Sequence, residues 1–307
     1  MEDPKTDKAI IPQIDDLRQS QKWGEYLAWL GWKSVVTSSG VNLEILSTKI
    51  GAMVKIQRPH ALSQAELDEI NKICLENKAL FIKLEPTYYQ DTETLVNTGY
   101  KKSYSPLSPP STMYIDLTQK EEDLWGKINK GGRYEIRHSE AETVFYKNPS
   151  EEILKSLYKL FLETSQKQKF TIQSFEDLKK KAEVFKDDCF VVLSYDKEKN
   201  ITGGKFFLGF KDNVWYIHAG TNHFGRKSDA GHKMMWESFL YFKNLGYKIL
   251  DMDGIDDPRF PVFTKHWGGF SFFKEKFGGI VVRFPHSYVL YIHPFFKFLN
   301  RFKELPI

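Results

Sequence analysis

The hydrophobic positions in the first part of the chain follow helical and strand periodicities in turn. Between positions 14 and 31, apolar side chains recur three or four residues apart and the pattern stops at Gly31, which predicts a helix with glycine at its end. Ser63 and Glu66 have the spacing of a capping box and predict the start of a second helix. Short runs rich in β-branched and apolar residues predict strands at 34–37, 43–47, 52–57 and 79–84.

A segment rich in proline and serine separates this unit from the next predicted strand, at 112–117. Thr118, with Glu121 three residues later, predicts the N-terminal cap of another helix. The pair Gly131 and Gly132 is expected to end or bend that helix, because glycine weakens a helix interior.

The second half of the chain repeats the alternation of helices and strands. Strands are predicted at 143–146, 189–195, 203–210, 213–218 and 247–252, and helices at 149–165, 174–185 and 229–245. A hairpin turn is expected at 211–213, and a basic amphipathic helix at the C-terminal end. Helix, strands, helix and strand thus occur twice, which predicts a duplicated α/β (α+β) fold with one domain at 1–145 and another at 146–307.

Composition is that of an ordinary globular protein. The 307 residues are 41% hydrophobic and 27% charged, which leaves room for two compact cores. A formal net charge of +4 permits binding to RNA but lacks the dense basic run of a dedicated nucleic-acid binder. The N-terminal residues lack the features of a signal peptide, and Cys74 and Cys189 have no paired spacing, so we expect a reduced protein in the cytoplasm.

Several common catalytic motifs are absent from the sequence. There is no phosphate-binding GxxxxGK[ST] loop, no GxGxxG fingerprint, no HExxH and no GxSxG. His218, His223 and His232 lie close in sequence, but none has the i, i+4 spacing of a helical metal site. We therefore expect neither a metal nor a cofactor.

Basic side chains in three places suggest contacts with phosphate. Lys33 follows the first predicted helix, and Lys167 lies in a predicted loop, where each could bind an anion or simply be solvated. A further basic group could follow a nucleic-acid backbone or form a solvated helix face; it comprises Lys127, Lys130, Arg133 and Arg137.

The strongest local combination of residues is LDMDGIDDP followed by HWGGFSFFKEKFGG. The first segment delivers Asp251 and Asp253 to a glycine turn at the end of a predicted strand. In the second segment, Lys274 is surrounded in sequence by phenylalanines, among them Phe273. A lysine removed from water in this way could stabilise a developing oxyanion, although it could also extend from an aromatic core to solvent.

These segments, taken in order, resemble the FemABX family of peptidoglycan-bridge aminoacyltransferases. The matching segments are QSQKWGEYLAWLGWK, LEP, TMYIDLTQKEEDLWGKI with RYEIRHSEAE, TSQKQKF, VWYIHAGT, LDMDGI and FFKEKFGG. The resemblance implies two tandem acetyltransferase-like (GNAT-like) domains, the first binding the acceptor and the second the aminoacyl-tRNA end. It also implies a monomer that moves an amino acid from aminoacyl-tRNA to the stem-peptide amine of UDP-MurNAc-pentapeptide or lipid II.

The resemblance also assigns roles to residues on the acceptor side. Lys33 matches a lysine that binds the diphosphate of the acceptor, and Lys167 stands where the family has its arginine partner. Glu85 matches an acidic residue near the acceptor amine, which it would orient or deprotonate. Tyr216 and His218 match an aromatic pair that lines the acceptor site, with histidine in place of the expected tyrosine.

On the tRNA side, the resemblance assigns Phe273 and Lys274 to the end of the tRNA, with Lys274 stabilising the oxyanion. The basic residues at 127–137 are candidate tRNA contacts. The chain has no long helical hairpin with charged heptads, so we expect no coiled-coil arm. The C-terminal stretch 288–305, with Lys297, Arg301 and Lys303, could rest on the inner face of a membrane or pack as a core helix.

Two other functions remain open from the sequence. Enzymes that transfer acyl groups from coenzyme A share the expected fold but carry a [QR]xxGx[GA] turn at a helix N-terminus. The segment 226–232 has its glycine misplaced for that turn. A non-catalytic protein that binds tRNA or a wall precursor is the other alternative, suggested by the basic patch and by the lysine at position 167.

Overall fold

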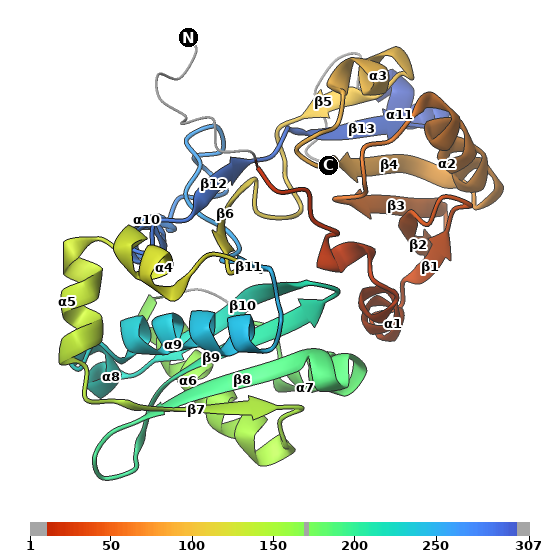
Figure 1. The fold of residues 1–307 in the computed structure, drawn as a ribbon. Helices are drawn as coiled ribbons and strands as arrows, with labels where there is room; N and C mark the ends of the chain where they lie inside the picture. The colour runs from red at the N-terminus through yellow and green to blue at the C-terminus, as the bar shows by residue number, and fades with distance from the viewer. Residues whose placement is uncertain (1–10, 169–171, 300–307) are drawn as a thin grey trace.

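The computed structural model describes residues 11–168 and 172–299 of the chain. They form two lobes, each built on one mixed β-sheet with helices packed against it (Figure 1). None of the described helices is both long enough and apolar enough to cross a lipid bilayer.

The first sheet has six strands in the order β1-β2-β3-β4-β13-β5. Their bounds are β1 Lys33–Val36, β2 Asn42–Thr48, β3 Gly51–Gln57, β4 Ala79–Glu85, β13 Ser287–Tyr291 and β5 Lys101–Ser103. Strands β3 and β4 are parallel and are joined by helix α2 (Gln64–Glu76), while the other neighbours are antiparallel. The capping box of Ser63 and Glu66 is confirmed at the start of α2.

Two short helices complete the first lobe, namely α1 (Gln21–Trp29) and α3 (Thr92–Asn97). Helix α1 follows the 3-10 turn η1 (Leu17–Gln19), and Ser20 caps it by accepting a hydrogen bond from the backbone of Trp23. The predicted stop at Gly31 is confirmed, since that glycine has a φ angle of 88°.

The second sheet has seven strands in the order β12-β6-β11-β10-β9-β8-β7. Their bounds are β12 Ile280–Arg283, β6 Ser111–Asp116, β11 Ile249–Asp251, β10 Asn213–Thr221, β9 Ile201–Phe210, β8 Cys189–Tyr195 and β7 Glu142–Lys147. Only β10 and β11 are parallel neighbours in this sheet. The hairpin between β9 and β10 has the two loop residues Lys211 and Asp212.

Each face of the second sheet is covered by a different set of helices. Helices α4 (Glu121–Lys127), α5 (Lys130–His138) and α9 (Ala230–Asn244) share a hydrophobic core with one face. Helices α6 (Glu151–Gln168) and α7 (Phe175–Phe185) pack on the other face. Alternate residues of each strand enter the two cores, because successive side chains of a strand point to opposite faces.

Two strands belong to the sheet that is built mainly from the other half of the sequence. Strand β6 precedes position 145 yet pairs within the second sheet, and β13 lies near the C-terminal end yet pairs between β4 and β5 of the first (Figure 1). The sheets therefore do not divide at residue 145. The assignment of acceptor and tRNA binding to 1–145 and 146–307 stays a prediction.

The structure corrects the expected C-terminal helix. Residues Ser287–Tyr291 form β13 instead, and the described helix that follows, α11, spans only Pro294–Leu299. The reason is that alternate side chains of this apolar run enter two different cores and the run pairs with a strand on each side. Lys297 is exposed on α11, while Arg301 and Lys303 lie outside the described residues.

The structure also corrects both ends of the segment after β6. Thr118 caps no helix, because its hydroxyl donates to Asp116, and α4 begins at Glu121. The break between α4 and α5 falls before Lys130 rather than at the glycine pair. Asn129 caps α5 by accepting a hydrogen bond of 2.7 Å from the backbone of Gly132, so both glycines lie in the first helical turn.

Gly278, after the last helix of the second lobe, is the position where the fold most clearly requires glycine. Its φ angle is 68°, and a Cβ atom there would lie 2.3 Å from the carbonyl oxygen of Lys127. We expect Gly278→Ala to lower the free energy of unfolding by about 2 to 4 kcal/mol, from backbone strain and the clash together. Denaturation in urea measures the loss.

Gly40→Ala is the matched control, because Gly40 has a φ angle of 87° but a Cβ atom there would meet no other part of the chain within 4 Å. It should lose only the conformational part, about 1 kcal/mol. Equal losses in the two variants would show that the contact with Lys127 does not matter.

Candidate functional site

The candidate site lies where β11 ends and its neighbour β10 continues. The two strands pair only from Asn213 to Trp215 on β10 and from Ile249 to Asp251 on β11. Lys274, on helix α10 (Gly268–Glu275), reaches the turn that follows β11. Its ammonium group donates hydrogen bonds of 3.0 Å to the carbonyl oxygen of Asp253 and 2.6 Å to that of Gly254.

Lys274 is 6% exposed and has aromatic rings around it. Its Nζ atom lies 4.9 Å from the ring centre of Phe270 and 5.6 Å from that of Tyr216. Burial lowers the pKa of Lys274 to about 8, although Asp253 and Asp251 act in the opposite direction. The structure thus places a desolvated cation at the end of β11, as the phenylalanine-rich sequence suggests.

A second buried lysine, which no sequence motif indicated, shares this site. Lys205 on β9 is 2% exposed, and its Nζ atom donates a hydrogen bond of 3.2 Å to the hydroxyl of Tyr216. The same atom lies 4.8 Å from the ring centres of both Tyr216 and Phe273. Burial, followed by the charge of Lys274, lowers the pKa of Lys205 to about 7. The available signal was a single lysine within the apolar run of β9.

Acidic groups lie beneath the turn that holds Lys274. The buried carboxylate of Asp251 accepts hydrogen bonds from the hydroxyl of Thr112 and from the backbone of Asp253, the latter at 2.7 Å. Burial and the charge of Asp253 raise the pKa of Asp251 to about 7. Asp253 itself has a φ angle of 52°, and this left-handed residue directs the carbonyl groups of the turn toward the lysine.

An arginine from the start of the chain fixes this turn from the other side. Arg18, in η1, lies 3.5 Å from the carboxylate of Asp253 and 3.2 Å from that of Asp16. Both carboxylates keep the guanidinium charged despite its burial. No sequence pattern indicated Arg18, because its partner is 235 residues away.

The predicted aromatic pair is separated by a bulge in β10. Tyr216 pairs with Phe207, but His218 pairs with Phe206, so Ile217 is an extra residue in the strand. Because Phe206 and Phe207 point to opposite faces, Tyr216 packs toward α9 while His218 lies on the face covered by α6 and α7. Tyr216 and His218 therefore lie on opposite faces of the sheet, and their place in an acceptor site stays a prediction.

His218 lies among groups of its own face. Its Nε2 atom is 3.4 Å from the side-chain oxygen of Gln173, and its ring stacks on Phe206. Burial, together with the nearby charge of Lys181, lowers the pKa of His218 to about 4. The imidazole is therefore neutral near pH 7 and can serve as a hydrogen-bonding group rather than as a cation.

Glu85 ends β4 and is 1% exposed. Its carboxylate accepts backbone hydrogen bonds of 2.6 Å from Leu107 and 2.9 Å from Ser108, and a side-chain bond of 3.3 Å from Gln57. Although burial acts to raise it, the pKa of Glu85 is lowered overall, because Arg58 and the hydrogen bonds outweigh burial. These contacts fix the loop before β6 and involve no residue of the lysine site among those described. The predicted contact with an acceptor amine stays a prediction.

The two predicted phosphate-binding lysines are both exposed. Lys33 is the first residue of β1, and its Nζ atom lies 3.3 Å from the side-chain oxygen of Asn77. Lys167 lies in the last turn of α6 rather than in a loop, because the helix continues to Gln168. No contact between the described residues joins Lys33 to Lys167.

The predicted tRNA contacts lie on and beside α5. Lys127 ends α4, and Lys130 starts α5; both side chains are exposed. Arg133 instead donates to the backbone carbonyl groups of Gly126 and Ile128, so it secures the end of α4. Arg137 is exposed and lies 5.1 Å from the ring centre of Trp125. Three of the four basic groups thus remain available to solvent.

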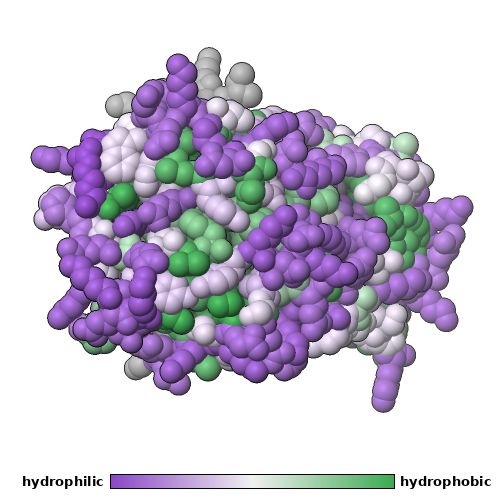
Figure 2. Space-filling view, turned by 60° about the horizontal axis from the view of Figure 1, so that its bottom comes forward, coloured by the Kyte–Doolittle hydropathy of each residue, from purple (hydrophilic) through white to green (hydrophobic). Residues whose placement is uncertain are grey.

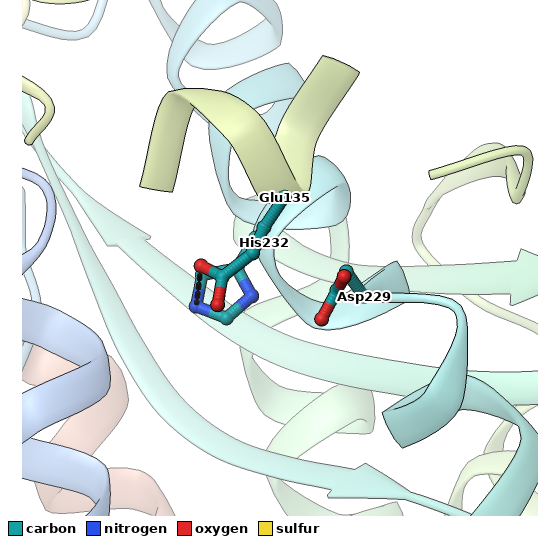
Figure 3. Close-up of side chains that lie close together, drawn as sticks. All are labelled: Glu135, Asp229 and His232. Carbon is teal, nitrogen blue, oxygen red and sulfur yellow. Dashed lines mark ion pairs between the residues drawn. The ribbon is translucent and has the colours of Figure 1, made fainter. Parts of the chain in front are cut away.

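Figure 3 shows a separate cluster of Glu135, Asp229 and His232 near the start of α9. Two carboxylates and an imidazole are metal-binding groups, but the ammonium of Lys276 already lies 2.6 and 2.7 Å from the carboxylate oxygens of Glu135. Burial lowers the pKa of His232 to about 4. Lys276 thus balances the charge of Glu135 in a polar contact between α5, α9 and the segment after α10, while Asp229 lies beside this pair.

Comparison with known proteins gives one matching family and several similar solved structures. A sequence model of the FemAB family matches residues 14–202. FemX is similar in structure, with a TM-score of 0.80 and 16% identity, over 94% of this chain and 95% of that one. No curated protein sequence matches the chain.

Two further solved structures resemble the chain at 10% identity. The C-terminal domain of a putative lysylphosphatidylglycerol synthetase from Agrobacterium fabrum gives a TM-score of 0.59 over 93% of this chain and 91% of that one. A tandem GNAT protein from the clavulanic acid biosynthesis pathway gives 0.50 over 84% and 82%. These likenesses confirm the predicted fold of two acetyltransferase-like domains, and no coiled-coil arm occurs within residues 11–168 and 172–299.

The raised pKa of Asp251 predicts a pH-dependent stability. A carboxyl group whose pKa is about 7 in the folded chain and about 4 when unfolded stabilises the fold below pH 4. That contribution is lost as the pH rises to 7. Relative to Asp251→Asn, the wild-type free energy of unfolding should fall by on the order of 1 kcal/mol per pH unit across this window.

Urea denaturation of both proteins at several pH values between about 4 and about 7 measures this difference. Asp187→Asn, at an exposed position, should run parallel to the wild type. Parallel curves for Asp251→Asn as well would mean that Asp251 is already ionised at low pH in the folded chain.

Proposed function

The chain belongs to the FemAB family, and on that premise we propose that it transfers an aminoacyl group from aminoacyl-tRNA to the stem-peptide amine of a peptidoglycan precursor. Members of this family are transferases that use aminoacyl-tRNA. The observation that carries the proposal is the buried ammonium group of Lys274, held by two carbonyl groups at the end of β11.

The proposed reaction is a direct acyl transfer. An amine attacks the ester carbon that links the amino acid to tRNA, and negative charge develops on the carbonyl oxygen. A preorganised cation at that oxygen lowers the barrier most where water is excluded. Lys274 supplies such a cation, because its pKa of about 8 keeps it mostly charged at pH 7. Phe273 and Phe270 supply aromatic surface for the end of the tRNA.

The acceptor in this proposal is UDP-MurNAc-pentapeptide or lipid II, both of which carry a diphosphate. Lys33 and Lys167 are the proposed diphosphate ligands, since both are exposed and neither is held in an ion pair among the described residues. Lys127, Lys130 and Arg137 are the proposed contacts of the tRNA backbone. Aminoacyl-tRNA is cytoplasmic, so the proposed reaction takes place there or at the inner face of the membrane.

A lipid acceptor is the second candidate within the same chemistry. The similar structure from Agrobacterium fabrum is described as part of a putative lysylphosphatidylglycerol synthetase, so phosphatidylglycerol belongs among the acceptors to be tested. The face drawn in Figure 2 exposes hydrophobic residues in small separate groups among hydrophilic ones, without a continuous apolar surface.

The charges at the N-terminus of α9 argue against acyl transfer from coenzyme A. Such enzymes hold a pyrophosphate at a helix N-terminus. Here Asp229 is the N-terminal cap residue, in left-handed conformation, and Glu135 lies beside it. Glu135 is paired with Lys276, but the carboxylate of Asp229 at this point would oppose the binding of a pyrophosphate.

Substitution of Lys274 tests the proposed function. Purified wild-type protein should transfer radiolabelled amino acid from a mixture of charged tRNAs to UDP-MurNAc-pentapeptide, lipid II or phosphatidylglycerol. Lys274→Met should lower kcat by about two to three orders of magnitude, because one oxyanion contact is lost. Lys197→Met, at an exposed ion pair with Glu140, should retain activity.

Failure of the wild type to transfer to any of the three acceptors would overturn the proposed function and favour a binding protein. Wild-type turnover in Lys274→Met would keep the function but remove Lys274 from the chemistry.

Charge reversal at the proposed diphosphate ligands should act on binding rather than on chemistry. Lys33→Glu and Lys167→Glu should each raise KM for UDP-MurNAc-pentapeptide about tenfold or more, with little change in kcat, because a charge-assisted contact is lost. Steady-state kinetics measures both constants.

Lys159→Glu is the matched control for the second of these variants, since Lys159 is also exposed on α6. A rise in KM in Lys159→Glu equal to that in Lys167→Glu would point to the general field of the helix instead of a specific phosphate contact.

A further inference from the structure

Lys205 is a buried amine whose charge the structure does not balance. It lies on β9 between residues that pack into the core under α9, and its strand neighbours across the sheet are Val192 and Ala219. No carboxylate among the described residues forms a hydrogen bond or ion pair with Lys205. A buried ammonium group without a counter-charge is strongly disfavoured, so such a lysine tends to lose its proton.

The groups that face Lys205 from the neighbouring elements also favour the uncharged form of its amine. Lys274 on α10 brings a second positive charge, and Tyr216 on β10 lies between the two lysines. His232 on α9 also senses the charge of Lys205, but its own pKa of about 4 leaves it neutral. The carboxylate that lies beside His232, that of Glu135, is already paired with Lys276.

Tyr216 connects Lys205 to the reacting side of the site. Its hydroxyl forms the hydrogen bond of 3.2 Å with Lys205, and its ring lies 5.6 Å from the Nζ atom of Lys274. Burial raises the pKa of Tyr216, so the phenol keeps a proton at neutral pH. A phenol in this position can pass a proton on while remaining a phenol.

We propose that Lys205 is a positioning residue for proton removal, whose uncharged amine accepts the hydroxyl proton of Tyr216 as that oxygen takes a proton from the attacking ammonium group. The inference rests on the proposed aminoacyl transfer. The ammonium group of the acceptor loses one proton to the oxygen of Tyr216, and the tyrosine proton moves to the nitrogen of Lys205. The freed amine then attacks the ester carbon. As the bond from that carbon to the tRNA oxygen breaks, the nitrogen gives its second proton to this oxygen, which leaves as the tRNA hydroxyl.

This arrangement gives the two lysines opposite protonation states. Lys274 must be charged to stabilise the oxyanion, and Lys205 must be neutral to accept a proton. Their order of titration agrees with that need, because the pKa of Lys205 is about 7 and that of Lys274 about 8. The rate should rise as the pH increases through the first value, where Lys205 loses its proton. It should fall above the second, where Lys274 loses its own.

The test is the dependence of kcat/KM on pH for the full chain, from about pH 6 to about pH 9, with UDP-MurNAc-pentapeptide as the acceptor. Lys205→Met should lose the rising limb and fall about 100-fold at the optimum, the lower range for loss of a proton-transfer group. Lys205→Arg should fall similarly, because a guanidinium group keeps its proton.

Lys181→Met controls for the loss of a buried lysine. Lys181 is equally buried, but it lies on the opposite face of the sheet, where its ammonium group is 2.6 Å from the carboxylate of Asp177. This variant should lose stability yet keep both limbs of the profile. The inference is overturned if Lys205→Met keeps the rising limb of the wild type, or if Lys205→Arg is as active as the wild type.

A second measurement needs no activity. Nitrogen-15 NMR of the lysine amines in the free protein should show one amine that titrates near pH 7 and disappears in Lys205→Met. If Lys205 stays charged above about pH 9, close to an ordinary lysine, this inference fails while the proposed transfer stands. If the wild type transfers no amino acid to any acceptor, the proposed function fails and the relay fails with it.

Discussion

The position of the Lys274 ammonium group depends on two backbone carbonyl groups, and much of the surrounding structure serves to hold them. They belong to the turn after β11, where Asp253 takes a left-handed conformation. Asp251 fixes that turn from within the sheet by accepting a bond from the backbone of Asp253. Arg18 fixes it from the first lobe. A cation buried without these oxygen atoms would lose its proton, and the site would lose the charge on which the proposed chemistry depends.

The same network joins the two lobes. Arg18 comes from the N-terminal segment, β13 returns from the far end of the chain to the first sheet, and β6 leaves the first half to join the second sheet. Arg58 adds a further link, since its guanidinium donates to the carbonyl groups of Pro86 and Pro109 on either side of the connection. The lobes are thus tied by strand exchange and buried polar contacts, and the site lies where these ties meet the second sheet.

Because β10 bulges after Tyr216, this tyrosine contributes to the site without His218. Without the extra residue, Tyr216 and His218 would point to the same face, and the hydroxyl that contacts Lys205 would be accompanied by an imidazole. The bulge instead sends the histidine toward α6 and α7. One face of the sheet is left with two lysines and aromatic rings, and the other holds the buried ion pair of Lys181 and Asp177. The two faces of the sheet therefore differ in charge.

The sequence alone determined most of the helices and strands, the capping box at Ser63, the glycine at position 31 and the desolvated character of Lys274. Each of these depends on neighbours within a few residues, so hydrophobic periodicity and local hydrogen bonding suffice to predict them. Only the tertiary structure decided that the run from Ser287 is a strand, that Glu85 accepts two backbone hydrogen bonds, and that Lys205 lies close to Lys274. These outcomes depend on which distant segments pair and which polar groups they bury together. A local sequence pattern determines neither.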